Sequence, residues 1–437
     1  MKYVFIIFIT LFFLGCSNKT LTSEFKIEDK IPNLTPNDLS YYPQYADPYL
    51  SNFSDINYTS KQNLRIFFEK YFAPWTRVFP FTKEEVSWAY YYKNKEYYGE
   101  NYQQIPKAWF EDIIEYSNID ALRSISEKAI VIENTNLRVF PSHKPIYAHF
   151  KNAGEGFPFD YNQNSSIKLN TPLLISHYSK DQAWAYVSSP TVAGWIDVKY
   201  IALVDDKFIK TFTKNNQYYV SIQDKIPLYK NKIYQTQVNI ATLFPLVGSK
   251  LAIAKKLYNN QAYISTIDKN ENIVPFPLPY DKKNIARMID RMINIPYGWG
   301  GLYGNRDCSA LTQDFYTLFS ILLHRNSSAQ KTNGIYTDIS KLSHQEKIET
   351  IKEKAIPFMT LFYFKGHIGI YLGTYKNEPV FFHATWGIKI KDEDEDFGRI
   401  IVGKSIISSL KLGKEFEQID SQSLLLEKMQ GFTNISN

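Results

Sequence analysis

A helix, a glycine-rich turn and a second helix are predicted between residues 282 and 322, and this segment constrains the fold more than any other. Apolar residues recur at helical spacing on both sides of the sequence YGWGG, and Pro296 lies just beyond the first pattern. They are Ile285, Met288, Ile289, Met292 and Ile293 before the turn, and Leu311, Phe315, Leu318, Phe319 and Leu322 after it. The glycines of the turn allow backbone angles and close approaches that side chains forbid. Cys308 is therefore predicted to lie at the N-terminus of the second helix.

The predicted position of Cys308 is one where a cysteine becomes reactive. The positive end of a helix dipole favours the thiolate, and a lower thiol pKa makes a cysteine a better nucleophile. Asp307, directly before it, is a natural N-cap for the same helix. Most cysteines are buried, inert thiols. Other motifs must therefore show whether Cys308 is a nucleophile or such a buried thiol.

Two histidines follow Cys308 in sequence typical of β-strands. A nucleophilic cysteine needs an imidazole to move its proton, and that imidazole needs a third group to hold its tautomer. In LFYFKGHIGIYLG, alternation puts Ile368 and Ile370 on one face of a strand and His367 on the other. The sequence PVFFHATWG predicts the next strand of a hairpin, which brings His383 within reach of His367. A cysteine at a helix start and two such histidines together favour a catalytic site.

These motifs carry a family resemblance. YGWGG with RDCSALTQD, GHIGIYLG, and FFHA resemble, in order, the motif blocks of NlpC/P60 cysteine peptidases over about residues 281–400. The resemblance implies a papain-like catalytic domain with a nucleophile, a histidine base and an orienting group. The implied roles are Cys308 as nucleophile, His367 as base and acid, His383 as the group that orients His367, Tyr297 as support near the oxyanion, and Asp307 and Ser309 as lining of the substrate groove.

The rest of the chain predicts a multidomain α+β protein, because 437 residues exceed the ~250–300 that one core serves. Residues 42–125 are helix-like and aromatic, and resemble the helical N-terminal region of lipoprotein peptidases of this family. Residues 126–204 have short strand-like runs between turn signals and resemble a bacterial SH3 domain, notably in WAYV and GWI. Residues 205–278 repeat this style more loosely and predict a second SH3-like barrel. The catalytic NlpC/P60 domain is expected over 279–437.

The N-terminus resembles the signal peptide of a bacterial lipoprotein. Residues 1–16, MKYVFIIFITLFFLGC, carry one lysine before an apolar run too short for a membrane span. Cys16 after a glycine resembles a lipobox, which implies that Cys16 is lipidated; a plain signal peptide or an uncleaved anchor is the alternative. Residues 17–41 then form a tether. The expected location is the periplasmic side of a bacterial membrane, and Ser17 favours the outer membrane.

The resemblance also implies the reaction. Relatives hydrolyse peptidoglycan stem peptides between γ-D-glutamate and the diamino acid, by acyl transfer to Cys308 and then to water. An SH3 domain beside the cleft would restrict the enzyme to peptides with a free N-terminal amine; alternatively, the barrels only anchor it to the wall. We expect no cofactor and no metal, because no histidine spacing indicates a metal site.

The expected partners are stem peptides and, through the lipid anchor, a membrane, with the protein itself a monomer. A net charge of +6 without a dense Lys/Arg block argues against a nucleic-acid partner. Three alternatives stay open at this point. They are an amidase or acyltransferase with the same Cys-His site, a wall-binding lipoprotein without activity, and a membrane-tethered assembly protein.

Overall fold

The computed structural model describes residues 34–54, 61–150, 152, 155–214, 217–391, 397–419 and 421–435. Cys16, the predicted signal peptide and most of the predicted tether lie outside these residues. Within them, no helix combines the length and the apolar character that crossing a bilayer requires. The lipid anchor therefore stays a prediction.

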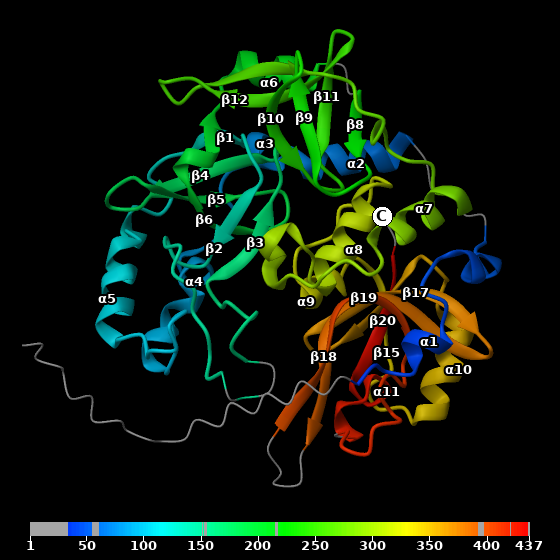
Figure 1. Ribbon diagram of the computed structural model, residues 1–437. Helices are drawn as coiled ribbons and strands as arrows, with labels where there is room; N and C mark the ends of the chain where they lie inside the picture. Colours follow the sequence, from blue (N-terminus) through cyan, green and yellow to red (C-terminus); the bar gives the residue numbers. More distant parts are fainter. Residues whose placement is uncertain are drawn as a thin grey trace, which may run out of the picture. The chain divides into compact units, whose positions relative to one another are not determined.

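Short helices make up the N-terminal region, as its helix-like sequence predicts (Figure 1). The elements are α1 (Asp38–Tyr41), η1 (Asp47–Asn52), α2 (Lys61–Tyr71), α3 (Ala73–Thr76), α4 (Lys83–Val86), η2 (Trp88–Asn94), α5 (Lys107–Tyr116) and η3 (Ile119–Ala121). A capping box between Thr82 and Glu85 starts α4. The buried aromatic rings Tyr49, Phe53 and Phe67 belong to the same apolar core as the helices around Cys308. The N-terminal region and residues 279–437, which form the expected catalytic domain and are called the catalytic unit below, therefore stabilise each other.

A first all-β module follows, in agreement with the strand-like sequence of residues 126–204. It holds β1 (Glu127–Val131), β2 (Thr135–Arg138), β3 (Gln163–Ile167), β4 (Pro172–Tyr178), β5 (Trp184–Ser188), β6 (Ala193–Asp197), η4 (Val198–Tyr200) and β7 (Ile201–Leu203). Its seven strands pair in the order β3-β2-β6-β5-β4-β1-β7. Leu173, Ile175 and Val187 are fully buried between them. The β2–β3 pair lies on the side that faces the catalytic unit (Figure 1).

The second β module begins with a helix that the sequence analysis does not predict. Asp205 caps α6 (Asp206–Thr213) by accepting a hydrogen bond from the Phe208 N–H, and the helix buries Phe208 and Phe212. A five-stranded sheet, β13-β12-β11-β8-β14, and a separate pair, β10-β9, follow. The strands are β8 (Tyr218–Ser221), β9 (Ile226–Lys230), β10 (Ile233–Val238), β11 (Leu243–Val247), β12 (Lys250–Lys256), β13 (Ala262–Ile267) and β14 (Ile273–Phe276). The prediction of strands in this region is thus confirmed, except that the region begins with a helix.

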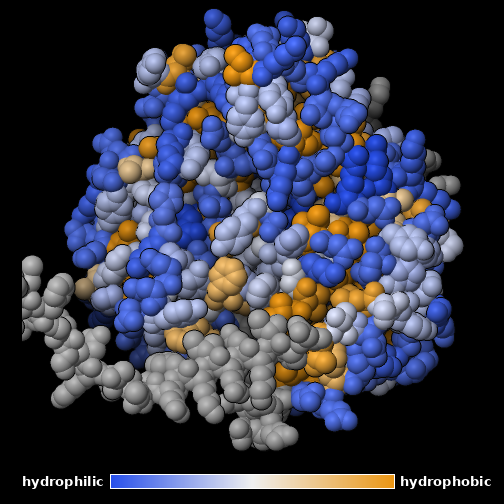
Figure 2. All heavy atoms as spheres, in the orientation of Figure 1, coloured by the Kyte–Doolittle hydropathy of each residue, from blue (hydrophilic) through white to orange (hydrophobic). Residues whose placement is uncertain are grey.

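The catalytic unit is built on an antiparallel sheet in the order β15-β20-β16-β17-β18-β19. Its helices are α7 (Lys282–Met292), η5 (Trp299–Gly304), α8 (Cys308–Thr317), α9 (Ser327–Gln330), α10 (His344–Lys354), η6 (Ser421–Ser423) and α11 (Leu425–Lys428). Its strands are β15 (Gly334–Asp338), β16 (Thr360–Phe364), β17 (His367–Tyr375), β18 (Glu378–Lys391), β19 (Phe397–Ser409) and β20 (Met429–Ile435). Helix α8 packs on β17 and β18. Figure 2 shows patches of hydrophobic side chains on the face over α8 and β17–β19.

Helix α8 is shorter than the apolar pattern predicts. The pattern continues to Leu322, but the helix ends at Thr317. The chain turns away because Ser320 adopts a left-handed backbone conformation, with φ of 61°. Leu318 and Phe319 nevertheless stay fully buried in the core. Apolar spacing therefore predicts burial here, and the turn decides where the helix stops.

The N-terminal region holds two strands of the catalytic sheet in place. The Asn52 side-chain amide donates to two carbonyls of β17, each 3.1 Å away. A Cβ atom at Gly373 would lie 2.3 Å from Asn52 Cγ, so this approach requires a glycine. Gln44 bonds both the N–H and the carbonyl of Ile407 on β19. Strands β17 and β19 carry site residues, so these contacts also fix the site.

Candidate active site

The turn before Cys308 forms as predicted and positions the nucleophile. Gly300 and Gly301 have left-handed φ angles of 56° and 84°. A Cβ atom on Gly301 would lie 2.2 Å from the Ser166 hydroxyl oxygen of the first β module. After the turn, Asp307 accepts a hydrogen bond from the Ala310 N–H at 2.8 Å and begins α8 at Cys308. The sequence prediction of a cysteine at a helix N-terminus is confirmed.

The direction of the Cys308 pKa shift is opposite to the one predicted from the helix dipole. Cys308 is only 8% exposed, and burial raises the pKa of its thiol to about 12. The Asp307 carboxylate raises the pKa further, whereas the Ile368 N–H and the charge of Arg325 oppose the rise. Loss of solvent around the sulfur outweighs the helix terminus. At neutral pH the resting site therefore holds a thiol.

The two histidines form a direct pair, as predicted. His367 Nε2 lies 2.8 Å from His383 Nδ1. The pair can approach because position 369 is glycine: a Cβ atom there would lie 2.6 Å from the Phe381 ring and 2.8 Å from His383 Cβ. Phe381 stacks on the His383 ring, with 4.0 Å between ring centroids. The packing leaves the His383 ring one position, which is what an orienting residue needs.

Ser408, on the neighbouring strand β19, completes the chain of hydrogen bonds. No sequence motif indicates this role. Its hydroxyl donates to the Ser409 carbonyl at 3.0 Å and lies 2.9 Å from His383 Nε2. Since the hydroxyl proton is used, Ser408 accepts from His383 Nε2–H. His383 Nδ1 is then an acceptor, and His367 donates its Nε2–H to it. This leaves His367 Nδ1 with a free lone pair, which is the atom of a general base.

Both histidines are neutral. Burial lowers the pKa of His367 to about 4, and the negative charge of Asp307 opposes part of this shift. Burial also places the pKa of His383 well below its ordinary value, and a proton on His367 would lower it further. A neutral imidazole can accept the proton of a neutral thiol when the sulfur attacks.

Tyr297 packs against the same apolar core that contains Cys308. Its N–H donates to the Gly403 carbonyl at 2.8 Å, and its ring lies 6.0 Å from the Trp386 ring. Burial places the pKa of the Tyr297 phenol well above its ordinary value, and the charges of Asp307 and Cys308 act in the same direction. The phenol therefore stays protonated and can donate a hydrogen bond. Its role near an oxyanion stays a prediction.

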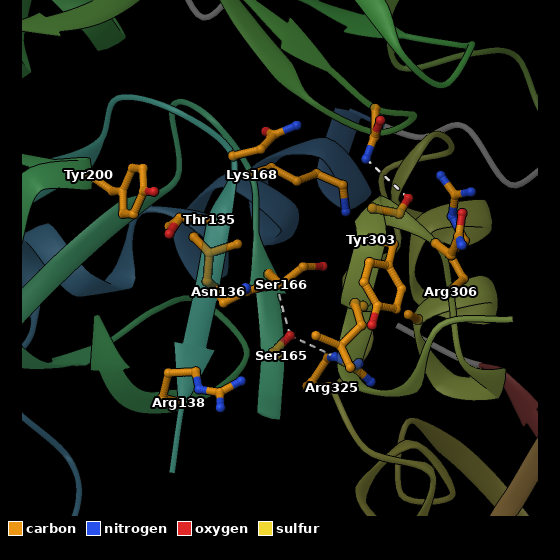
Figure 3. A pocket seen from close by; sticks show the side chains of 18 of the residues that line it. Thr135, Asn136, Arg138, Ser165, Ser166, Lys168, Tyr200, Tyr303, Arg306 and Arg325 are labelled. Atoms are coloured by element: carbon orange, nitrogen blue, oxygen red, sulfur yellow. Dashed lines mark hydrogen bonds between the residues drawn. The ribbon is translucent and has the colours of Figure 1, made fainter. Parts of the chain in front are cut away.

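Asp307 and Ser309, which are predicted to line the substrate groove, form hydrogen bonds within the protein. Arg325 donates to both Asp307 oxygens, at 3.1 and 2.7 Å, and to the Ser309 hydroxyl at 2.8 Å. Ser309 in turn donates to Asp307 at 3.2 Å. Arg325 also donates to Ser165 of the first β module at 2.8 Å (Figure 3). Because all four residues are buried, this network fixes the residues beside the nucleophile and connects them to the β module.

A polar cavity of about 420 Å³ lies between β2–β3, the turn at Gly301–Arg306 and α8 (Figure 3). Arg325 lines it but Cys308 does not. Its cations are paired: Lys168 and Arg306 both bond Asp314, and Arg306 also reaches Asp224 of the second β module at 2.6 and 2.7 Å. These ion pairs connect the modules behind the catalytic residues. In the part of the chain that the structure describes, no group of His, Cys, Asp or Glu side chains could hold a metal ion.

Three family models match the chain. They are the N-terminal NLPC_P60 stabilising domain over residues 5–122, an SH3 domain of the SH3b1 type over 145–197, and the NlpC/P60 family over 294–398. The SH3 match covers only the first β module. The chain is thus a multidomain α+β protein with one matched SH3b domain, and the second SH3-like barrel stays a prediction.

One solved structure supports this assignment along most of the chain. An NlpC/P60 endopeptidase from Photobacterium damselae subsp. piscicida is 28% identical with a TM-score of 0.80, over 90% of this chain and 97% of that one. An NlpC/P60 family protein from Bacillus cereus is 16% identical with a TM-score of 0.44, over 70% and 98%. No curated protein matches this chain. The chain belongs to the NlpC/P60 family of cysteine peptidases and carries its N-terminal stabilising domain and an SH3b domain.

Proposed function

We propose that this protein hydrolyses peptidoglycan stem peptides at the bond between γ-D-glutamate and the diamino acid. The observation that carries the proposal is the chain of hydrogen bonds from Ser408 through His383 to His367, which leaves one unprotonated nitrogen on His367. Membership of a family of peptidoglycan hydrolases supports the substrate class. A site without activity would not need this arrangement of tautomers in its interior.

The reaction proceeds by acyl transfer. His367 Nδ1 takes the thiol proton as the Cys308 sulfur attacks the γ-carbonyl carbon, and the sulfur–carbon bond forms as the carbonyl becomes an oxyanion. Tyr297 donates a hydrogen bond toward this oxyanion. The oxyanion collapses, the amine of the diamino acid leaves with the proton from His367, and a thioester remains. Water then attacks the thioester, with His367 as base, and releases the γ-D-glutamyl product and the thiol.

The test is to incubate the purified protein with purified muropeptides and to identify the products by mass. The expected products are a peptide that ends in D-glutamate and one that begins with the diamino acid. Cys308→Ser should give neither product while its circular dichroism spectrum stays unchanged. Release of intact stem peptides from the glycan would instead assign an amidase, and transfer to an added amine an acyltransferase.

We also propose that the SH3b domain restricts the N-terminal end of the cleft. Asp307 already pairs with Arg325, so it is a poor partner for a substrate ammonium group. Glu155, a carboxylate from the SH3b domain whose charge acts on Arg399, is the better one. A tripeptide with a free N-terminal amine should then be cut faster than its N-acetylmuramoyl form. Equal initial rates would leave only an anchoring role for the SH3b domain.

We further propose that Cys16 carries a lipid and holds the enzyme on the periplasmic side of the outer membrane. The sequence of residues 1–16 supports this. Cys16→Ala should move the protein from the membrane fraction to the soluble fraction without loss of activity on a soluble peptide. A mass spectrum of the mature N-terminus that shows no acyl chains on Cys16 would contradict the proposal.

A further inference from the structure

Arg399 is a cation close to Tyr297 in the candidate site. It lies on β19, opposite Lys389 of β18. Its Nε atom is buried and has no hydrogen-bond partner, and among the described residues no carboxylate forms an ion pair with it. An unpaired buried charge destabilises a fold, because the protein must give up its hydration without a substitute. Arg399, which is half-buried, therefore lacks the ion pair that the buried arginines near the site have.

The buried arginines near the site provide the comparison. Arg325 bonds Asp307, and Arg306 bonds Asp224 and Asp314. Each of these guanidinium groups is matched by carboxylates from the protein. Arg399 is half-buried, and within the described residues it forms no such ion pair.

Arg399 lies against an aromatic cluster that joins two modules. Its guanidinium carbon lies 5.9 Å from the ring centroid of Phe159, which comes from the SH3b domain. Phe159 meets Trp299 at 5.2 Å and Trp386 at 6.1 Å, both in edge-to-face geometry. Phe159 thus covers one face of the half-buried guanidinium. An anion bound there gains more electrostatic energy than it would in open solvent.

Tyr297 connects this cluster to the reacting sulfur. Its ring contacts Trp386, and its phenol interacts electrostatically with both Cys308 and Arg399. The phenol is protonated at neutral pH and cannot serve as the counter-ion. Glu155 also acts on the charge of Arg399 but forms no ion pair with it, and in the proposed complex Glu155 engages the substrate ammonium group. A carboxylate that enters the cleft would therefore find Arg399 unpaired.

We propose that Arg399 binds the α-carboxylate of the D-glutamyl residue on the acyl side of the scissile bond. The inference rests on the proposed function. In a γ-linked glutamyl peptide the α-carboxylate stays free, and it is the single carboxylate of the acyl half. Contact of Arg399 with the SH3b residue Phe159 places it on the side where the acyl half is proposed to lie. A planar guanidinium can hold a carboxylate by two parallel hydrogen bonds, which also fixes the carbonyl for attack.

The experiment compares two tripeptides of L-alanine, γ-D-glutamate and a diamino acid, which differ in a free or amidated D-glutamyl α-carboxylate. The full-length enzyme should cut the amidated peptide with a kcat/KM about 10- to 150-fold lower, the range for one hydrogen-bonded charged group. Arg399→Gln should lose a similar factor on the free acid and should cut both peptides at nearly equal rates. Arg399→Lys should keep part of the preference, because it keeps the charge without the planar geometry.

Lys404→Gln is the matched control, since Lys404 is another base on β19 whose amine donates to Asn294 at 2.9 Å. It should keep the full preference for the acid. A third peptide, amidated on the diamino acid, tests the leaving half and should be cut at the normal rate. Equal rates of the wild-type enzyme on the acid and the α-amide would overturn the role of Arg399 even if Arg399→Gln fails to fold. Failure to cut any of the three peptides would overturn the proposed function and this inference with it.

Discussion

Replacing Ser408 by alanine tests whether the hydrogen-bond chain sets the tautomer of the catalytic base. Ser408 is fully buried and touches neither Cys308 nor, by any hydrogen bond, His367. In the variant, the His383 Nε2–H loses its acceptor in the interior of the sheet. The His383 proton can then move to Nδ1, where it faces His367. His367 must in that case carry its own proton on Nδ1 and is no longer a base toward the thiol.

The size of the effect follows from the lost acceptor. Leaving a buried donor unsatisfied costs about 1–3 kcal/mol. That cost falls on the productive tautomer, so the same energy reappears in the activation barrier. At about 1.4 kcal/mol per tenfold change in rate, kcat should fall by about 5- to 150-fold. The KM should change little, because Ser408 lies behind His383 and away from the substrate.

The assay pairs steady-state kinetics on a stem peptide with long-range ¹⁵N–¹H spectra of the histidine rings, which report the protonated nitrogen directly. Ser405→Ala is the control, because Ser405 is also buried on β19, and its hydroxyl donates to the Met292 carbonyl at 2.6 Å. It should lose comparable stability and keep its kcat. Retention of wild-type kcat by Ser408→Ala with an unchanged His383 tautomer would refute the reasoning.

Three further outcomes are expected. Cys308→Ala should abolish hydrolysis without lowering the melting temperature, and His367→Ala should lose about as much activity. His383→Gln should keep more activity than His383→Ala, because an amide oxygen can still accept the His367 N–H. Steady-state rates check this order. Burial lowers the pKa of His367 to about 4 and raises that of Cys308 to about 12. We therefore expect kcat/KM to stay constant from neutral pH down to near pH 5, and absorbance at 240 nm to show no thiolate at pH 7. A fall of kcat/KM with a midpoint near pH 6.5 would contradict a neutral resting pair. Arg306→Met should lower the free energy of unfolding by about 3–5 kcal/mol, because it removes the buried partner of Asp224 and leaves Asp314 with Lys168 alone. Lys83→Met, which breaks an exposed pair, should have little effect in the same denaturation experiment.

Local sequence predicts the catalytic pair because its signals act over a few residues. A glycine-rich turn followed by a capping aspartate predicts Cys308 at a helix start, and the helix begins there. Alternation along one strand predicts which face carries His367. Gly369 then predicts a close neighbour, and His383 occupies the space. These inferences need only the geometry of one turn and one hairpin.

Other parts of the site depend on contacts that no local pattern encodes. Ser408 reaches His383 from the adjacent strand, and its serine neighbours at 405 and 409 give the same sequence signal without touching the histidine. Arg325 follows the turn after α8 with no motif that indicates an ion pair, yet it engages both residues that flank the nucleophile. Pairing partners of this kind are chosen by the packing of distant elements.

By itself, the sequence determined the family and predicted Cys308, His367 and His383 as its catalytic residues, because periodicity, capping and turn formation are short-range properties of the chain. Only the tertiary structure decided the protonation of the site. The helix terminus at Cys308 favours a thiolate, but burial beneath β17 and the nearby Asp307 charge outweigh it. The free energy of a charge depends on every group and on all the solvent around it, and folding brings those groups together from the whole chain.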